Sequence, residues 1–320
     1  RMTANVSKEE VFRLARAMTF KNALAGIPFG GAKAGIVWAG GSDALKKKYV
    51  ESFARLLAPF VPERYIAGPD VNTGEKEMQW FAEAVGSRKA ATGKPKKMGG
   101  LPHELGSTGF GVVESAAVAA EFAGLDLKKA TVAIEGFGNV GVFAFRFLRK
   151  MGAKIVAVAD SKGAIYSSEG LDERKLVKIK KESGSVKNYP IGNKIRREEI
   201  FGLPVDVLIP ASVTDVINDF NKFSIKAKII VEGANIPMPE KIEEELFKKG
   251  ILIVPDFVAN AGGVISSYAE YRGFHEKKMF DLVKTKIRKI TRLVLEKSRQ
   301  SGKSPRKTAL EIAKSKISGK

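Results

Sequence analysis

Three glycines with the spacing Gly-x-Gly-x-x-Gly follow a short apolar run at 131–134 and open a helical pattern; they are Gly136, Gly138 and Gly141. Gly136 permits a tight turn, Gly138 lets the backbone approach a pyrophosphate, and Gly141 lets helix and strand pack closely. The unbonded N–H groups and the positive end of the helix dipole would hold the phosphates. The pattern predicts a dinucleotide site, and the alternative is a glycine turn in an ordinary strand–helix–strand unit.

A second apolar run, 154–159, ends at Asp160, nineteen residues after Gly141. An acid at this place accepts hydrogen bonds from a ribose 2′-OH, which favours NAD, and it repels the 2′-phosphate of NADP. Lys162 follows closely. It can pair with such a phosphate as a point charge, or it can be a solvated loop residue. The sequence therefore leaves the choice between NAD and NADP open.

Lys33 stands in a frame of small residues, Gly30-Gly31-Ala32-Lys33-Ala34-Gly35. Such neighbours let a ligand approach both the backbone and the amine, and a surface lysine has little need of them. A lysine used in catalysis at neutral pH needs a pKa below its ordinary value of about 10.4, which burial or a second cation provides. Lys21, near the end of the preceding helical pattern, is a candidate for that cation. The alternative for Lys21 is a solvated lysine favoured by the helix dipole.

Asp70 ends the strand-like run 65–70, beside Gly68 and Gly74. This place suits a carboxylate of a binding site. It suits equally well the N-cap of a helix expected at 75–86. The residues alone do not decide between the two.

Helical and strand patterns organise the rest of the chain. A capping box at Ser7–Glu10 begins a helix that should end before Pro28, and helices are also expected at 43–58 and 107–122. Five apolar runs alternate with helical stretches, which predicts an α/β fold with a Rossmann-like, doubly wound parallel sheet. The strands are expected at 131–134, 154–159, 206–209, 229–232 and 251–254.

At 320 residues the chain is long enough for two domains. We expect a smaller α/β substrate domain at 1–106 and a nucleotide-binding domain at 107–265. Amphipathic C-terminal helices at 266–320 should return to the substrate domain and complete it. The charged insert at 163–200 should be peripheral.

The composition is that of a globular protein, with 44% hydrophobic and 28% charged residues, which excludes disorder for most of the chain. Cysteine is absent and only His103 and His275 could supply imidazoles, so neither disulfides nor a metal site are expected. No apolar run reaches the ~18 residues of a membrane span and no signal peptide is visible, which predicts a cytoplasmic protein.

The net charge of +20 fits nucleic-acid binding. However, the lysines lie among acids in helical patterns, which favours solvated faces or attraction of an anionic substrate or cofactor.

Several motifs in order give nearly the whole chain a resemblance to the glutamate dehydrogenases of the amino-acid dehydrogenase superfamily. They are Thr-Phe-Lys21-Asn-Ala, Pro-Phe-Gly-Gly-Ala-Lys33-Ala-Gly, Ala-Gly-Pro-Asp70, Ser-Thr108-Gly, the glycines 136–141, Val-Glu-Gly-Ala-Asn235 and Asn260-Ala-Gly-Gly-Val-Ile-Ser-Ser267. The resemblance implies reversible, NAD(P)-dependent oxidative deamination of L-glutamate to 2-oxoglutarate and ammonium by a homohexamer. It implies no nucleic-acid and no membrane partner.

The resemblance also implies roles for single residues. Lys21 would hold the substrate α-carboxylate, and Lys33 would activate the water that attacks the iminium carbon and stabilise the carbinolamine. Asp70 would carry protons to and from the departing ammonia. Ser267 would hydrogen-bond the side-chain carboxylate of glutamate. The family's cleft closes to bring the nicotinamide against the substrate Cα.

Further positions follow from the same resemblance. Asn260, which lines the cleft, and Val264 join the expected substrate-binding residues. Thr108 and Asn235 lie where the family contacts the nicotinamide end. The expected cofactor-binding residues are Thr108, Gly136, Phe137, Gly138, Asn139, Val140, Gly141, Asp160, Ser161, Lys162, Ala211 and Asn235.

One departure from the family pattern concerns the γ-carboxylate of glutamate, which the family binds through a further lysine in a Lys-Gly-Gly-Ile-Arg-like segment. Arg1-Met2 resembles the end of that segment, so this lysine and part of the hexamer contact are expected upstream of Arg1. Cofactor binding but very weak glutamate turnover is expected from residues 1–320. Full turnover would require another cation, for example from the lysine-rich run 94–97.

Two other functions remain open. A leucine, valine or phenylalanine dehydrogenase would use the same machinery with an apolar side-chain pocket; Ser267 argues against it, because such a pocket gains nothing from a buried hydroxyl. A non-catalytic, Rossmann-like protein that binds nucleotide or RNA would not need Lys33 together with Asp70.

Overall fold

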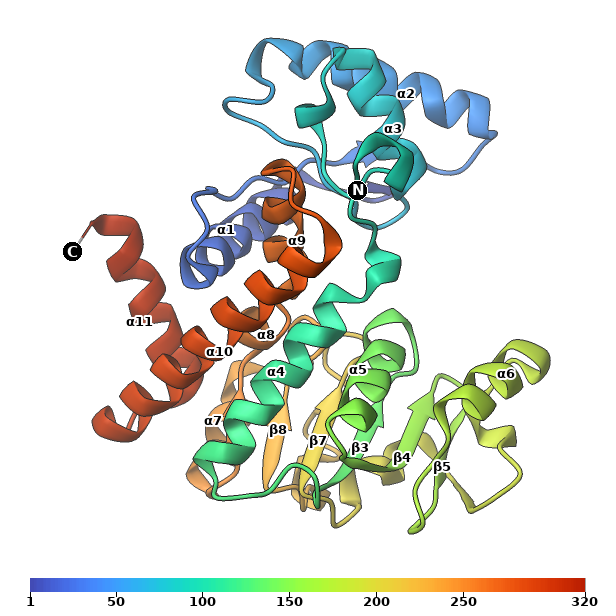
Figure 1. The fold of residues 1–320 in the computed structure, drawn as a ribbon, viewed down its shortest axis with the longest axis vertical. Coiled ribbons are helices and arrows are strands. Elements are labelled where there is room, and N and C mark those ends of the chain that lie inside the picture. Colours follow the sequence, from blue (N-terminus) through green and yellow to red (C-terminus); the bar gives the residue numbers. More distant parts are fainter. Residues whose placement is uncertain (320) are drawn as a thin grey trace. The chain divides into compact units, whose positions relative to one another are not determined.

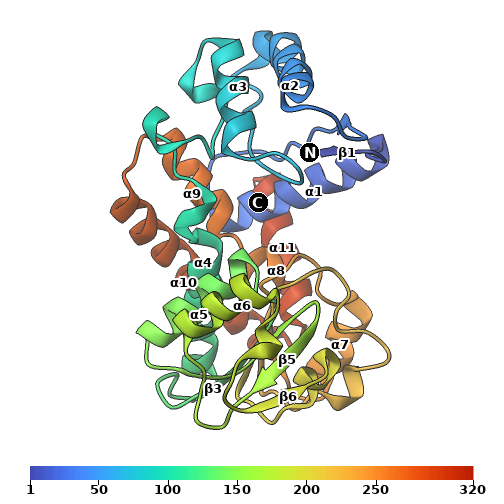
Figure 2. The same ribbon diagram turned by 90° about the vertical axis from the view of Figure 1, so that its right-hand side faces the viewer.

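The computed structural model describes residues 1–319 and divides the chain into two compact units (Figures 1 and 2). Unit 1 comprises residues 1–105 and 263–283. Unit 2 comprises residues 106–262 and the chain from Lys284 onward. The boundary after residue 105 lies beside the one expected at 106. The C-terminal part differs from the expectation, because only residues up to 283 belong to unit 1.

Unit 2 is built on a seven-stranded sheet with the order β6-β5-β4-β3-β7-β8-β9 (Figure 1). The strands are β3 (Thr131–Glu135), β4 (Lys154–Asp160), β5 (Gly163–Tyr166), β6 (Asn193–Ile195), β7 (Val207–Pro210), β8 (Ile229–Val231) and β9 (Leu252–Val254). Adjacent strands from β4 through β3, β7 and β8 to β9 pair in parallel. The expected doubly wound parallel sheet is therefore confirmed. β5 and β6 add two antiparallel strands at one edge.

Helices cover both faces of this sheet. They are α4 (Ser107–Phe122), α5 (Asn139–Lys150), α6 (Glu173–Ser183), α7 (Glu240–Lys248), α8 (Asp256–Ala259) and α11 (Pro305–Ser318). Ile134 of β3 faces α5, where an added Cβ on Gly141 would lie 3.3 Å from its Cγ2. Its neighbour Ala133 packs in the cluster that holds Ile242 of α7. Since successive strand residues point to opposite faces, α5 and α7 lie on opposite sides. The middle residues of β3 and β4 are apolar because both faces of the sheet are buried there.

The C-terminal helix α11 is fixed within unit 2 by a charged cluster. The Arg306 guanidinium, 11% exposed, pairs with Glu232 at 2.8 Å, with Asp256 at 2.9 Å and with Glu243. Ala309 on the same helix is fully buried. Breaking a buried ion pair is costly, so these contacts explain why this helix belongs to unit 2 and not to the substrate domain.

Unit 1 combines a two-stranded parallel sheet with helices. Its elements are β1 (Met2–Thr3), β2 (Ile36–Val37), α1 (Lys8–Ala25), α2 (Asp43–Leu57), α3 (Glu75–Val85), α9 (Gly262–Tyr271) from residue 263, and α10 (Glu276–Ser301) up to residue 283. Ser7 is the N-cap of α1, as expected, and its hydroxyl accepts the Glu10 N–H at 3.1 Å. The Glu10 carboxylate pairs with Arg1. In α2 and α3, Val50, Ala54 and Phe81 form part of the core.

No helix in the described chain is long and apolar enough to cross a membrane.

Candidate active site and dinucleotide site

In unit 1, Lys33 and Asp70 form an ion pair with 2.9 Å between Nζ and Oδ2. Both side chains are about four-fifths buried, with 19% and 21% of their surface exposed. Arg1 Nε donates to the same Asp70 oxygen at 3.0 Å. The N-cap of α3 is Gly74, so Asp70 does not have the capping role that the sequence left open. Its carboxylate faces the lysine.

The electrostatics of this pair decide the protonation state of the acid. Burial raises the pKa of Asp70, but the hydrogen bonds and charges of Arg1 and Lys33 outweigh burial and lower it to about 2. Asp70 is therefore ionised at neutral pH, and its carboxylate lies within hydrogen-bond distance of Lys33 Nζ.

The segment 28–35, here called the lysine loop, packs tightly on the chain around it. A Cβ added to Gly31 would lie 2.2 Å from Thr19 Oγ1 of α1, and one added to Gly35 would lie 2.4 Å from Val6 Cγ2. Only Gly30 has open space around its Cα. Close packing explains Gly31 and Gly35, whereas the sequence suggested that both served ligand access.

Helix α1 also holds the lysine loop through a side chain. Asn22, 4% exposed, donates from Nδ2 to the Gly30 carbonyl at 2.5 Å. Lys21 precedes it in the same helical turn and is half-buried. The helix that carries Lys21 thus also positions the loop that carries Lys33.

Helix α9 meets the lysine loop through aromatic rings. Phe29 makes edge contacts with Tyr268 and Tyr271, with centroids 5.4 and 5.5 Å apart. Val264 and Ser267 are half-buried, as are these two tyrosines, whereas the intervening positions of the helix are buried. Spacings of three and four residues place the half-buried set on one side of α9. Val264 and Ser267 therefore share the side of the helix that contacts the lysine loop.

A carboxylate that the sequence did not single out joins α9 to the connection before unit 2. Glu270, with a side chain 1% exposed, accepts the N–H groups of Gly93 at 2.8 Å and Leu101 at 2.7 Å. It also pairs with buried Lys94. The Lys94 ammonium is therefore engaged within unit 1, which argues against it as the further cation for a γ-carboxylate. No local pattern signals this contact, because its partners lie far apart in sequence.

In unit 2, the glycine turn has the geometry that its spacing predicts. Gly136 has φ +102°, and an added Cβ would lie 2.6 Å from Ser212 N. A Cβ on Gly141 would lie 1.9 Å from the Gly136 carbonyl oxygen. Gly138 is exposed at the start of α5 with nothing within 4 Å of an added Cβ. This opening at a helix N-terminus, which Asn139 begins, fits a pyrophosphate.

A buried acid just before the first glycine anchors this turn. Glu135 ends β3, is fully buried, and accepts Arg197 Nη2 at 2.7 Å and Ser212 Oγ at 2.7 and 2.8 Å. Ala211, which follows β7, donates its N–H to the Glu135 carbonyl at 2.6 Å. The insert 163–200, which contains Arg197, was expected to be peripheral. It instead extends the sheet through β5 and β6, and its Arg197 compensates the buried Glu135 carboxylate at the turn.

The remaining expected cofactor residues lie around the ends of the parallel strands and at the starts of helices. Asp160 is 5% exposed, and Ser161 and Lys162 after it are exposed. Phe137 is buried, Asn235 is exposed, and Val140 and Thr108, in the first turns of α5 and α4, are half-buried.

Asn260, expected to bind substrate, shapes a loop of unit 2. Its Nδ2 donates to the carbonyls of Gly233 and Ala234 at 3.3 Å and to Asn235 Oδ1 at 2.9 Å. Its own Oδ1 is buried without a protein partner. Asn260 therefore fixes the loop 233–235, and its Oδ1 remains an acceptor without a hydrogen bond from the described chain.

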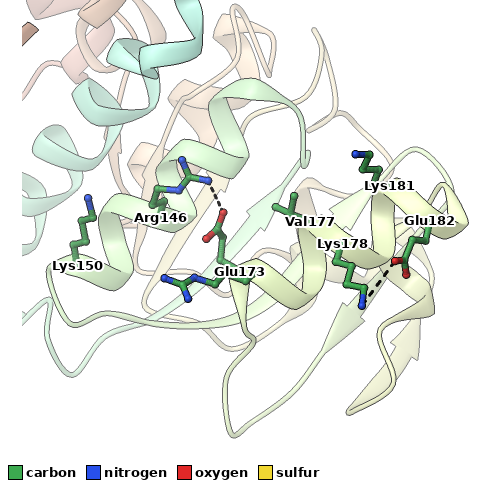
Figure 3. A pocket seen from close by; sticks show the side chains of 8 residues that line it. Arg146, Lys150, Glu173, Val177, Lys178, Lys181 and Glu182 are labelled. Atoms are coloured by element: carbon green, nitrogen blue, oxygen red, sulfur yellow. Dashed lines mark hydrogen bonds and ion pairs between the residues drawn. The ribbon is translucent and has the colours of Figure 1, made fainter.

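A groove of about 830 Å³ lies between α5 and α6 (Figure 3). Figure 3 shows its side chains arranged along the two helices, with an ion pair between Arg146 and Glu173 at 2.7 Å and another between Lys178 and Glu182 at 3.9 Å. The groove is mostly basic; its lining residues are Arg146, Lys150, Glu173, Arg174, Val177, Lys178, Lys181 and Glu182. It contains none of the expected site residues.

Two family models match the chain. The Glutamate/Leucine/Phenylalanine/Valine dehydrogenase model matches residues 99–319, and the Glu/Leu/Phe/Val dehydrogenase dimerisation-domain model matches residues 1–87.

Curated relatives are similar over most of this chain. A glutamate dehydrogenase of Aeropyrum pernix is 46% identical over 280 residues, which are 83% of this chain and 66% of that protein. An NADP-specific glutamate dehydrogenase of Saccharolobus shibatae is 42% identical over 85% of this chain and 66% of its own length. An NAD-specific glutamate dehydrogenase of Clostridioides difficile is 37% identical over 85% of this chain and 68% of its own length. The chain thus spans about two thirds of the length of the curated relatives it matches.

Solved structures share the fold. The hetero-hexameric glutamate dehydrogenase of Thermus thermophilus, in its leucine-bound form, has a TM-score of 0.87 and 29% identity, covering 98% of this chain and 78% of that one. The L-tryptophan dehydrogenase of Nostoc punctiforme has a TM-score of 0.75 and 26% identity, covering 100% of this chain and 86% of that one.

Proposed function

Since this chain belongs to the glutamate, leucine, phenylalanine and valine dehydrogenase family, we propose that it carries out the reversible, NAD(P)-dependent oxidative deamination of L-glutamate. The products are 2-oxoglutarate and ammonium. The observation that carries the proposal is the partly buried pair of Lys33 with Asp70, 2.9 Å apart, on the unit that also positions Ser267. The identity to curated glutamate dehydrogenases supports it.

The two charged residues divide the proton chemistry between them. A nicotinamide, when bound, accepts or supplies the hydride. Lys33 places an ammonium beside the oxygen of the carbon that water attacks, where negative charge develops. Its electrostatic stabilisation of that charge is larger in a partly dry site than in water. Asp70 has a lowered pKa and is therefore ionised. Because a lowered pKa makes it a weak base, it is proposed to relay the proton that a substrate amine gives up, not to retain it. Lys21, on the helix that supports the lysine loop, is proposed to bind the α-carboxylate.

Substrate choice is assigned to α9. Ser267 can donate a hydrogen bond to a side-chain carboxylate, which favours glutamate over an apolar amino acid. The alternative is a dehydrogenase for apolar amino acids, and the half-buried Val264, Tyr268 and Tyr271 beside Ser267 are the feature that favours it. The fold shared with a tryptophan dehydrogenase is compatible with that alternative.

Reductive amination of 2-oxoglutarate and of 2-oxoisocaproate with ammonium tests the proposal. We expect a higher kcat/KM for 2-oxoglutarate. Ser267→Val should lower the ratio of the two kcat/KM values about ten- to a hundred-fold, because a carboxylate loses a hydrogen bond worth ~1.5–3 kcal/mol. Ser266→Ala, at the neighbouring buried position, is the control and should leave the ratio unchanged. A preference for 2-oxoisocaproate would favour the alternative function, and an unchanged ratio in Ser267→Val would show that Ser267 does not contact the substrate.

Assembly and cofactor belong to the same proposal. Relatives are named both NADP-specific and NAD-specific. These names support a nicotinamide cofactor for this chain but do not distinguish NAD from NADP. The proposed assembly is a homohexamer. The match of residues 1–87 to a dimerisation-domain model supports an oligomer. The cytoplasmic location stays a prediction.

A further inference from the structure

Asp160, the acid expected to bind the cofactor ribose, is already occupied by its own chain. Its Oδ1 accepts the Lys162 N–H and the Ser185 hydroxyl, both at 2.9 Å, and its Oδ2 accepts the Val186 N–H at 2.7 Å. The side chain is 4% exposed. A carboxylate offers about four acceptor positions, so only one remains. Asp160 thus acts mainly as an anchor that ties the segment after α6 to the end of β4.

The remaining acceptor position faces a lysine from α6. Lys180 Nζ lies 3.9 Å from Asp160 Oδ2 and donates to the Phe137 carbonyl at 2.8 Å. Phe137 is the residue between the first two glycines of the turn. In a Rossmann-like fold the adenine ribose binds between this turn and the end of the second parallel strand. An ammonium therefore stands where the ribose 2′ position is expected, and its side chain is 34% exposed.

This arrangement suits an anion better than a hydroxyl. Three donors already compensate the Asp160 charge, and Lys180 has two further N–H groups after its bond to Phe137. A phosphate monoester carries about −1.5 to −2 charges at pH 7 and is a strong acceptor for such donors.

Lys162 is placed differently. A Cβ added to Gly184, which caps the C-terminal end of α6, would lie 2.9 Å from Lys162 Nζ, so this lysine lies at the negative end of that helix.

We propose that Lys180 binds the 2′-phosphate of NADP(H) and that the dinucleotide site of this chain prefers the phosphorylated cofactor. The inference rests on the proposed function and deepens it, because neither the family nor its named members fix this choice for the chain. Lys180 belongs to the insert that the sequence assigned to the periphery. Its helix also lines the basic groove of Figure 3, for example through Lys181.

Two nucleotides that differ only at the ribose 2′ position test the inference without turnover. Calorimetric titration should show that adenosine 2′,5′-bisphosphate binds the wild-type chain at least about ten-fold more tightly than adenosine 5′-monophosphate. Lys180→Met should reduce this ratio about ten- to a hundred-fold, as expected for the loss of a charge-assisted bond. Lys180→Arg should keep most of it. Lys181→Met removes the same charge from the next position and is the matched control, with an unchanged ratio.

The possible results separate the inference from the proposed function. Equal affinity of the wild-type protein for the monophosphate and the bisphosphate would overturn the inference. An unchanged affinity ratio of the two nucleotides in Lys180→Met would also overturn it, provided that the variant unfolds at the same temperature as wild type. If Lys180→Met does not fold, the same comparison is made with Lys180→Gln. If neither NADH nor NADPH binds by fluorescence titration, the dinucleotide site itself fails, and the proposed function fails with it.

Discussion

Lys33 and Asp70 are far apart in the sequence, yet their side chains form an ion pair with 2.9 Å between Nζ and Oδ2. If this pair performs the proton transfers, Lys33→Ala and Asp70→Asn should each lower kcat about 10²- to 10⁴-fold, the usual contribution of general acid–base catalysis. NAD(P)H affinity should not change, because the dinucleotide residues belong to unit 2. Steady-state kinetics and cofactor titration measure both quantities. Lys96→Ala, which removes an exposed ammonium paired with Glu276, is the control. Near-normal kcat in either variant would exclude that residue from the mechanism.

The lowered pKa of Asp70 adds a dependence on pH. An unfolded aspartate has a pKa of about 3.9, so the ionised side chain contributes stability above that pH and loses it as the pH falls towards the folded value of about 2. The difference in melting temperature between wild type and Asp70→Asn should therefore be present at pH 7 and shrink below pH 4. A difference that grows on acidification would contradict the direction of the shift.

At the scale of elements, Glu270 connects α9 to the segment 93–101. Glu270→Gln would leave the Lys94 ammonium, 4% exposed, without its counter-charge. Removing one partner of a buried ion pair costs about 3–5 kcal/mol, whereas an exposed pair contributes about 0–1 kcal/mol. Urea unfolding should show a loss of that size for Glu270→Gln. The exposed pair of Glu276 with Lys96 provides the control, and Glu276→Gln should have little effect. Equal effects of the two substitutions would mean that the buried pair is not important for stability.

At the scale of the whole molecule, the surface of unit 1 carries large exposed apolar side chains. Phe12 is 71% exposed, Val37 63% and Leu56 76%, all within the region that matches a dimerisation domain. Exposed apolar side chains in a region that matches a dimerisation domain are candidates for its contact surface. Leu56→Lys should therefore shift the protein towards smaller assemblies in light scattering, with little change in melting temperature. Ile191→Lys changes a residue of unit 2 that is 56% exposed and is the control. An unchanged assembly in Leu56→Lys would place the contact elsewhere.

The parallel strands, the glycine turn and the N-cap of α1 could be predicted from the sequence. These features depend on residues that are close in the chain: alternation and apolar runs define strands, and the spacing of Gly136, Gly138 and Gly141 is set by one turn and one helix start. The sequence also identified Lys33 and Asp70 as candidates. It did not decide whether Asp70 was a cap, because both roles suit an acid between a strand-like run and a helical pattern.

The pairing of the charged groups, in contrast, became visible in the folded chain. Glu270 meets Lys94 and Asp160 meets Ser185 and Val186, and none of these contacts follows from a local period. Whether a carboxylate binds a ligand or anchors its own chain depends on which donors the fold brings to it, because a buried charge must be compensated by whatever lies nearest. For the same reason the insert with Lys180 could be predicted as charged, but its contact with the glycine turn could not.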